Sequence, residues 1–213
     1  DLFEHPEGRP LPLFSGGAHV MVEMQDGDIL RRNAYSLISD PEDGSGYEIA
    51  VQREDQGRGG SLFMHEKARP GDLMRVGLPV NLFALNLTAR KHLLIAGGVG
   101  ITPVMSMARW FYDTNANVDM VFVHSARSPK DIIYQRELEH MAARINNFSL
   151  HVICEKHGLG ESWAGYRGYL NKPMLELIAP DYLKREIFCC GPTPYMAAVK
   201  RLLEVSGYDM SRY

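Results

Sequence analysis

Cysteine is scarce in this 213-residue chain, which has three, Cys154, Cys189 and Cys190. Two of them are adjacent, so they predict no disulfide framework, and this usage is typical of the reducing cytoplasm. Three thiols are also one short of the four that hold an iron–sulfur cluster. We therefore expect a cytoplasmic protein with no metal site in this chain.

The chain also has no excess of positive charge and no long hydrophobic run. Its formal net charge is −3, which predicts no basic surface for nucleic acid. No apolar run approaches the roughly 20 residues that cross a membrane. The first residues, DLFEHPEGRP, are acidic and polar, unlike a secretory signal. We therefore expect neither nucleic acid nor a membrane as a partner.

Short strand patterns fill the first half of the chain. Hydrophobic residues alternate with polar ones, and Asp26-Gly27 and Pro70-Gly71 predict turns between the strands. Four strands are predicted, over residues 18–24, 29–38, 46–53 and 73–78, with one or two helical turns over 62–67. Closely spaced strands with turns between them predict a small antiparallel barrel.

From about residue 88 the pattern changes to strands that alternate with helices. Strands are predicted over 93–96, 118–123, 148–154 and 186–190. Helices are predicted over 103–113, from Ser128-Pro129 onward, over 173–178 and from Thr193-Pro194 onward, with a glycine-rich loop over 157–168. This alternation predicts a parallel sheet with helices on both faces. We therefore predict two domains, a barrel over 1–87 and an α/β domain over 88–213.

The most informative stretch is LLIAGGVGITP, residues 93–103. A buried strand ends at the glycines 97–100, and Thr102-Pro103 then begins a helix. Glycines let a backbone approach a ligand, and a helix N-terminus favours negative charge, so this turn would suit a phosphate. The third glycine of the GxGxxG fingerprint is missing, so an ordinary tight turn remains the alternative. Cys190-Gly191-Pro192 follows another parallel strand, and ligands bind where such strand ends meet.

A third strand end lies at Ser125-Ala126-Arg127, where the adenosine ribose of a dinucleotide commonly binds. Arg127 would suit a 2′-phosphate, whereas Asp131 would accept hydrogen bonds from a free ribose diol. The alternative for both residues is a solvated helix cap.

Two stretches of the first half also carry polar groups in a binding pattern. Tyr35 and Ser36, on a strand, would hydrogen-bond a flat heteroaromatic ring. The 59–61 turn, Gly59-Gly60-Ser61, offers backbone N–H groups and a hydroxyl to a phosphate. Taken alone, the two stretches are better explained as a plain strand and a glycine turn.

Taken together, six motifs in this order resemble the ferredoxin–NADP reductase superfamily. The most similar branch is the reductase components of Rieske-type oxygenases, such as the phthalate dioxygenase and the carnitine and glycine-betaine monooxygenase reductases. The motifs are residues 16–20 (GGAHV), 33–37 (NAYSL), 57–61 (GRGGS), 81–85 (NLFAL), 96–103 (AGGVGITP) and 190–192 (CGP). The resemblance covers nearly the whole chain.

The resemblance implies a flavin-binding barrel followed by a nicotinamide domain, in an NADH-dependent flavoprotein reductase. Such a protein passes electrons from NADH through flavin to an iron–sulfur centre of an oxygenase system. By motif, the flavin would contact Asn33, Ala34, Tyr35, Ser36, Ala50, Val51, Gly59, Gly60 and Ser61. The nicotinamide nucleotide would contact Gly98, Gly100, Thr102, Pro103, Cys190, Gly191 and Pro192. Ser36 and Cys190 are the catalytic candidates, with Cys190 as a positioning residue rather than a nucleophile and Cys189 as a core residue.

Three departures accompany the resemblance. The family has arginine where this chain has Asn33, and strand alternation lets only one of Arg31 and Arg32 replace that charge. The first barrel strand and the aromatic-rich end of the nicotinamide domain appear in the family but not in the sequence given. Because the three cysteines of this chain are too few to hold it, the [2Fe–2S] cluster is expected in a missing domain or in a partner.

The cofactors follow from finer details of the same resemblance. Asn81-Leu82-Phe83 resembles the FMN-using branch and no second aromatic platform for an adenine is evident, so FMN is favoured, with FAD as the alternative. Asp131 favours NADH, and Arg127 keeps NADPH open. The expected partners are a terminal oxygenase, a ferredoxin or both. Rival functions are a free-standing flavin reductase and a non-catalytic nucleotide-sensing module.

Overall fold

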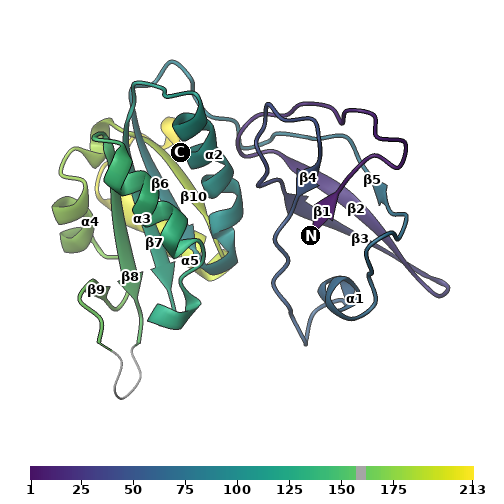
Figure 1. The fold of residues 1–213 in the computed structure, drawn as a ribbon. Helices are drawn as coiled ribbons and strands as arrows, with labels where there is room; N and C mark the ends of the chain where they lie inside the picture. Colours follow the sequence, from purple (N-terminus) through teal and green to yellow (C-terminus); the bar gives the residue numbers. More distant parts are fainter. Residues whose placement is uncertain (157–161) are drawn as a thin grey trace. The chain divides into compact units, whose positions relative to one another are not determined.

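The structure, a computed structural model, describes residues 1–156 and 162–213, and its chain divides into two compact units (Figure 1). The first unit is Asp1–Leu85 with Met105–Trp110, and the second is Asn86–Val104 with Phe111–Tyr213. The glycine-rich loop predicted over 157–168 lies partly outside the described residues. Each unit is described by itself.

The first unit consists of two small antiparallel sheets and one short helix. One sheet pairs β1 with β4, and the other has the order β3-β2-β5. The elements are β1 (Leu2–Phe3), β2 (His19–Asp26), β3 (Ile29–Ser36), β4 (Tyr47–Glu48), α1 (Gly60–Glu66) and β5 (Arg75–Val76). The strands predicted over 46–53 and 73–78 are therefore only two residues long. Beyond Glu48 the first of these makes one further bridge, between Ile49 and Leu37, and residues 51–54 have no regular structure.

Alternation along β2 builds the core of this unit. Val20, Val22 and Met24 are fully buried, whereas Met21 between them is 42% exposed. The buried face packs with Leu37, Tyr47, Ile49 and Met64. Because successive side chains of a strand point to opposite faces, the sequence pattern alone sets which face is buried.

The second unit is a five-stranded parallel sheet in the order β10-β6-β7-β8-β9. Its strands are β6 (Lys91–Gly97), β7 (Asp119–Ala126), β8 (Phe148–Cys154), β9 (Tyr166–Arg167) and β10 (Glu186–Cys190). Its α-helices are the two ends of α2 (Ile101–Asp113), whose middle groups with the first unit, and α3 (Gln135–Arg144), α4 (Lys172–Ile178) and α5 (Thr193–Val205). Short 3₁₀ turns lie at Gly98–Gly100, Pro129–Asp131, Tyr182–Lys184 and Met210–Arg212.

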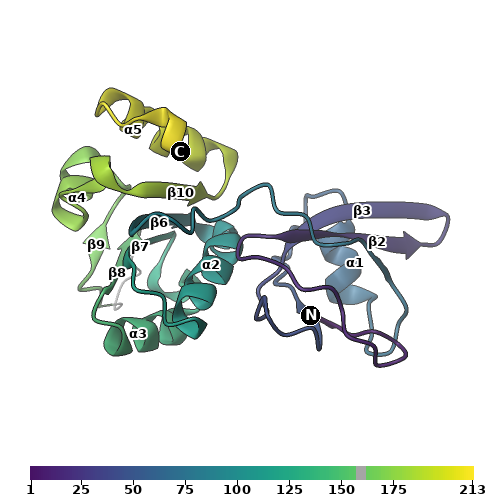
Figure 2. The ribbon, with the colours of Figure 1, turned by 90° about the horizontal axis from the view of Figure 1, so that it is seen from above.

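Helices cover both faces of this sheet, as the alternation of strands and helices predicts. Figure 2 shows α4 and α5 on one face and α2 and α3 on the other. On the α4–α5 face, Leu93 and Ile95 of β6 pack with the helix residues Leu175, Val199 and Leu203. Strands buried on both faces read as continuous apolar runs, which is the pattern of residues 93–96.

Two details of the second unit differ from the sequence prediction. A fifth strand, β9, lies within the segment predicted as a loop. The helix predicted from Ser128 begins instead at Gln135, because Pro129–Asp131 forms a single 3₁₀ turn. Beyond that turn Ile132 is extended (ψ 111°) and Tyr134 is left-handed (φ 56°), so no α-helix can run through them.

Candidate functional site

The strand order of the second unit creates a switch point between β6 and β10. The chain runs from β6 outward through β7, β8 and β9, and β10 then returns to the other side of β6. In open α/β sheets a ligand binds in the crevice at such a switch point, outside the carboxyl ends of the strands. The loops at this point are the two glycine turns, Gly97–Gly100 and Cys190–Pro192.

These two loops lie in direct backbone contact. A Cβ added at Gly100 would overlap the backbone of Cys190 and Gly191, so only glycine fits there. Gly98 has a φ of +51°, and a Cβ added to it would meet nothing within 4 Å, so its backbone faces open space. The structure therefore brings the predicted residues Gly98, Gly100 and Gly191 together.

The start of α2 completes this loop. The Thr102 hydroxyl donates to the Val99 carbonyl over 3.2 Å, and both Thr102 and Pro103 are buried. Thr102 therefore fixes the loop through this hydrogen bond. The N–H of Ile101, the first residue of α2, bonds to the Gly98 and Val99 carbonyls, so the N–H groups that favour an anion at this helical start are those of the 3₁₀ turn Gly98–Gly100. An open glycine loop in front of a 13-residue helix fits the pyrophosphate of a dinucleotide.

Polar residues at the end of β7 have partners of their own. The Ser125 hydroxyl lies 2.9 Å from the Tyr195 hydroxyl, which belongs to the first turn of α5. The Asp131 carboxylate accepts a hydrogen bond from the Ser128 hydroxyl over 2.7 Å, while Arg127 is exposed. Sequence reasoning missed Tyr195, because nothing in the local pattern of α5 separates it from a core-facing residue.

The two cysteines that end β10 have different surroundings. Cys189 is buried in the core on the α4–α5 face, and burial raises the pKa of its thiol to about 12. Cys190 is half-buried, and burial also raises its pKa. Cys190 therefore stays a neutral thiol near pH 7, which is unlike a nucleophile.

In the first unit, Arg31 and Asn33 lie on the face of β3 that turns toward the start of α1. The Arg31 guanidinium donates to the Arg58 carbonyl, and a Cβ added at Gly59 would lie 2.8 Å from Arg31 Cζ. A Cβ added at Gly60 would overlap the Asn33 amide. Arg32 lies on the other face and pairs with Glu23 over 2.8 Å. Alternation therefore leaves Arg31 as the cation beside the 59–61 turn.

Tyr35 belongs to the same face of β3. The Asn33 amide donates to the Tyr35 hydroxyl over 3.1 Å. Burial raises the Tyr35 pKa, and the hydrogen bond from Asn33 does not offset it. Ala34 and Ser36 point to the opposite face, so the structure does not bring the Ser36 hydroxyl to the same face of β3 as the Tyr35 ring.

The remaining candidates of the first unit lie around α1. The Ser61 hydroxyl accepts a hydrogen bond from the Glu54 backbone N–H over 3.0 Å, and Gly59 has a φ of +85°. Ala50 and Val51 are half-buried, and the Val51 carbonyl lies 2.8 Å from His65 Nε2. Arg31, which also pairs with Asp26 over 3.4 Å, places positive charge beside a glycine turn, an arrangement that suits a phosphate group.

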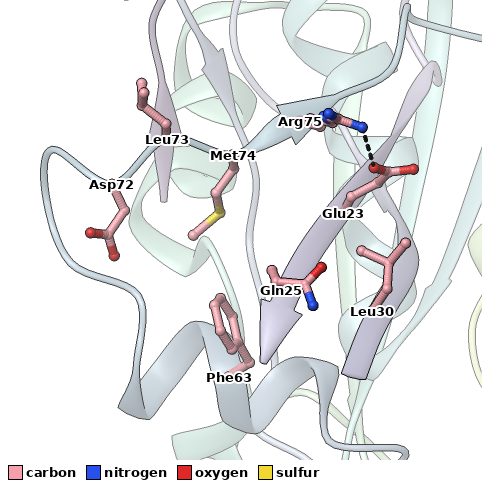
Figure 3. Close-up of a pocket in the computed structure, with 8 residues that line it drawn as sticks. All are labelled: Glu23, Gln25, Leu30, Phe63, Asp72, Leu73, Met74 and Arg75. Carbon is pink, nitrogen blue, oxygen red and sulfur yellow. Dashed lines mark ion pairs between the residues drawn. The ribbon is translucent and has the colours of Figure 1, made fainter. Parts of the chain in front are cut away.

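Two hollows in the first unit lie outside the predicted site. One, of about 510 Å³, has a Glu23–Arg75 ion pair of 4.0 Å, between a half-buried glutamate and an exposed arginine, on one side and Phe63 with Met74 on the other (Figure 3). Its lining is Glu23, Gln25, Leu30, Phe63, Asp72, Leu73, Met74 and Arg75. The second, of about 530 Å³, is lined by residues of the segments 4–10 and 43–45. Neither lining includes a predicted site residue.

Comparison with known proteins identifies the second unit. Residues 94–201, more than half of the chain, match the model of the oxidoreductase NAD-binding domain. The chain belongs to the oxidoreductase NAD-binding domain family. In this family member the matched region begins within β6 and ends within α5, so it contains both glycine loops.

Relatives of this oxidoreductase chain include reductase subunits of oxygenases. The glycine betaine monooxygenase reductase subunit of Pseudomonas aeruginosa is 63% identical over 202 residues, which is 94% of this chain and 55% of that protein. The carnitine monooxygenase reductase subunit of Escherichia coli is 41% identical over 195 residues, 91% of this chain and 56% of that protein. The chain thus spans little more than half the length of these relatives.

A solved structure supports the same assignment. Phthalate dioxygenase reductase, described as modular for electron transfer from pyridine nucleotides to [2Fe–2S], has a TM-score of 0.76 and 28% identity to this chain. The match covers 95% of this chain and 58% of that protein. The predicted fold class and the resemblance to oxygenase reductases are therefore confirmed. Among residues 1–156 and 162–213, no helix is long and apolar enough to span a membrane.

Proposed function

We propose that this chain is the flavin- and NADH-binding part of a reductase that supplies electrons to a Rieske-type oxygenase. The observation that carries the proposal is the contact between the two glycine loops at the switch point of the second unit. The names of the relatives, glycine betaine and carnitine monooxygenase reductase subunits, support the oxygenase as the destination of the electrons.

In this proposal the second unit binds NADH. The backbone of Gly98 and Gly100, at the start of α2, receives the pyrophosphate, and the strand end Cys190–Pro192 positions the nicotinamide ring. Asp131 accepts hydrogen bonds from the adenosine ribose and so favours NADH, while the exposed Arg127 is the residue that would favour NADPH. The nicotinamide domain spans residues 88–213 and the flavin domain residues 1–87.

In the first unit, the proposed cofactor is FMN, with FAD as the alternative. When bound, a flavin accepts a hydride from NADH and releases the two electrons singly. Tyr35 contacts the ring with its side chain, Ser36 on the opposite face of β3 reaches it only through its backbone, and Ala50 and Val51 lie at its pyrimidine edge. The turn Gly59–Ser61 receives the phosphate, and Arg31 supplies the positive charge that the family places at position 33.

The electrons then go to a [2Fe–2S] centre in a further domain or in a partner protein. Reductases of this kind serve a terminal oxygenase, with or without a separate ferredoxin. The three cysteines of the chain, all at least half-buried and none in a disulfide, are consistent with a cytoplasmic protein.

The test is an absorbance spectrum before and after anaerobic addition of NADH, with mass spectrometry of the flavin released by heat. We expect a bound FMN that bleaches when NADH is added. A protein that binds FMN tightly but does not bleach would favour the nucleotide-sensing module. Release of reduced flavin, with no electron transfer to an added ferredoxin, would favour the free-standing flavin reductase.

A further inference from the structure

The ring of Tyr195 fills the space beneath both glycine loops. A Cβ added at Gly97 would lie 2.7 Å from Tyr195 Cδ1, and one added at Gly191 would lie 2.8 Å from the same atom. The ring therefore takes the place that side chains at these two positions would need. It belongs to the α4–α5 side of the sheet, where it packs against the core.

The hydroxyl of Tyr195 reaches past β6 to β7. Ser125 is the residue of β7 that pairs in register with Gly97 of β6, and its hydroxyl lies 2.9 Å from that of Tyr195. The ring can cross β6 at this point because Gly97 has no side chain. One side chain of α5 thus connects the carboxyl ends of β10, β6 and β7, the three strands around the switch point.

We propose that Tyr195 and Ser125 form a clasp that positions the two glycine loops for the dinucleotide, which makes Tyr195 a positioning residue of this site. The inference rests on the proposed function, since it concerns the same nucleotide. Glycine-rich segments lose more backbone entropy on ordering than other segments. A clasp that orders them before the ligand arrives reduces the entropic cost of binding.

This role differs from direct contact with the nucleotide. The two hydroxyls act as one unit, so losing either partner breaks the same link. In a double-mutant cycle such partners show coupling, whereas two independent ligand contacts add. The cycle therefore separates a clasp from two separate binding groups.

The experiment is titration of NAD⁺ by calorimetry into the flavin-loaded full-length protein and three variants, Tyr195→Phe, Ser125→Ala and the double variant. We expect each single variant to raise the Kd for NAD⁺ about threefold to tenfold, the effect of one lost hydrogen bond. The double variant should bind no more weakly than the weaker single variant, and flavin content should stay unchanged.

Tyr208→Phe is the matched control. Tyr208 packs in the same core, but its hydroxyl donates to the carbonyl of Arg185, at the opposite end of β10. This variant should lower the melting temperature and leave the Kd for NAD⁺ within twofold of wild type. If Tyr195→Phe behaves like Tyr208→Phe, the tyrosine is merely structural and the clasp is overturned.

Two other results have distinct meanings. Additive losses in the double variant would overturn the clasp in favour of two direct contacts with the nucleotide, and the proposed function would stand. Wild-type protein that binds flavin but takes up neither NAD⁺ nor NADH would instead overturn the proposed function, and the clasp with it.

Discussion

His124, in β7, is fully buried; neither ring nitrogen makes a hydrogen bond of good geometry among the described residues, although the nearby Ala96 backbone partly favours the protonated ring. Burial lowers its pKa from 6.5 to about 4, so the folded protein holds a neutral imidazole where the unfolded chain would bind a proton. Above pH 6.5 both states hold a neutral imidazole, so His124 adds no proton-linked cost to the fold. As the pH falls from 6.5 to 4 the unfolded chain gains the proton first, and the fold loses about 3 kcal/mol of stability.

His124→Leu should reduce the acid sensitivity of the fold. Leucine binds no proton, so between pH 7 and pH 4.5 the variant should lose about 2–3 kcal/mol less free energy of unfolding than wild type. Urea titrations at both pH values measure this difference. His92, whose pKa burial also lowers, is common to both proteins, so it cancels in the comparison.

His140→Gln is the control, because His140 is exposed on α3. It should follow the wild-type pH dependence. Parallel pH profiles for wild type and His124→Leu would show that His124 is not the group that titrates.

Cys190→Ala should slow reduction of the flavin without loss of flavin. In the proposed site the half-buried thiol of Cys190 ends the strand that would position the nicotinamide, so the smaller side chain should loosen that position. We expect hydride transfer to slow about tenfold in anaerobic stopped-flow reduction by NADH. Cys189→Ala, in the core, should lower stability and leave this rate unchanged. An unaltered rate in Cys190→Ala would remove Cys190 from the site.

At the scale of elements, a buried arginine joins the amino ends of three strands. Arg185 precedes β10, and its side chain is 7% exposed. Its guanidinium donates to both carboxylate oxygens of Asp119, at the start of β7, over 2.8 and 3.0 Å. It also donates to Asp181 over 2.6 Å, and the same carboxylate pairs with Lys91 at the start of β6. The arrangement ties β6, β7 and β10 at the end opposite the glycine loops.

Arg185→Met should lower the free energy of unfolding by about 2–3 kcal/mol. Removing one partner of a buried ion pair costs about 3–5 kcal/mol, and the partial exposure of both aspartates reduces the loss. Urea unfolding measures it, with exposed Arg201→Met on α5 as the control. A loss no larger than that of Arg201→Met would mean that the carboxylates are fully solvated without Arg185.

At the scale of the whole molecule, each unit has a hydrophobic core of its own. Val20, Val22 and Met24 belong to the core of the first unit, and Leu93 and Ile95 to that of the second. Two cores allow two ligand sites to be stabilised separately, because a ligand adds stability only to the state that binds it.

Hydrogen exchange should therefore detect the two cofactors in different segments. NAD⁺ should slow exchange of the backbone amides in 97–102 and 190–196, and FMN in 50–63, because a bound ligand restricts the local opening of the segments it contacts. Mass spectrometry of peptides after exchange measures both effects. Protection confined to peptides 23–30 and 72–75 would instead place a ligand in the hollow of Figure 3.

Local pattern was enough for much of the fold. The alternation of hydrophobic and polar residues over 18–24 correctly predicted which face of β2 is buried. The apolar run before the glycines at 97–100 correctly predicted a strand that is buried on both faces. Strands alternating with helices required a parallel sheet, and the strand ends placed the glycine turns at one edge of it. These features depend on residues close in sequence, whose spacing the sequence displays directly.

Tertiary structure decided what depends on distant residues. Local pattern could not choose between Arg31 and Arg32, because the choice depends on which face of β3 meets the 59–61 turn, some 27 residues away. The local pattern also missed β9, because a strand of two residues is too short to show an alternation of hydrophobic and polar side chains. It placed the start of α3 too early, since the helix begins at Gln135. The meeting of Ser125 with Tyr195 joins residues 70 positions apart. Side chains so far apart meet only through the order of the strands, which no local periodicity encodes.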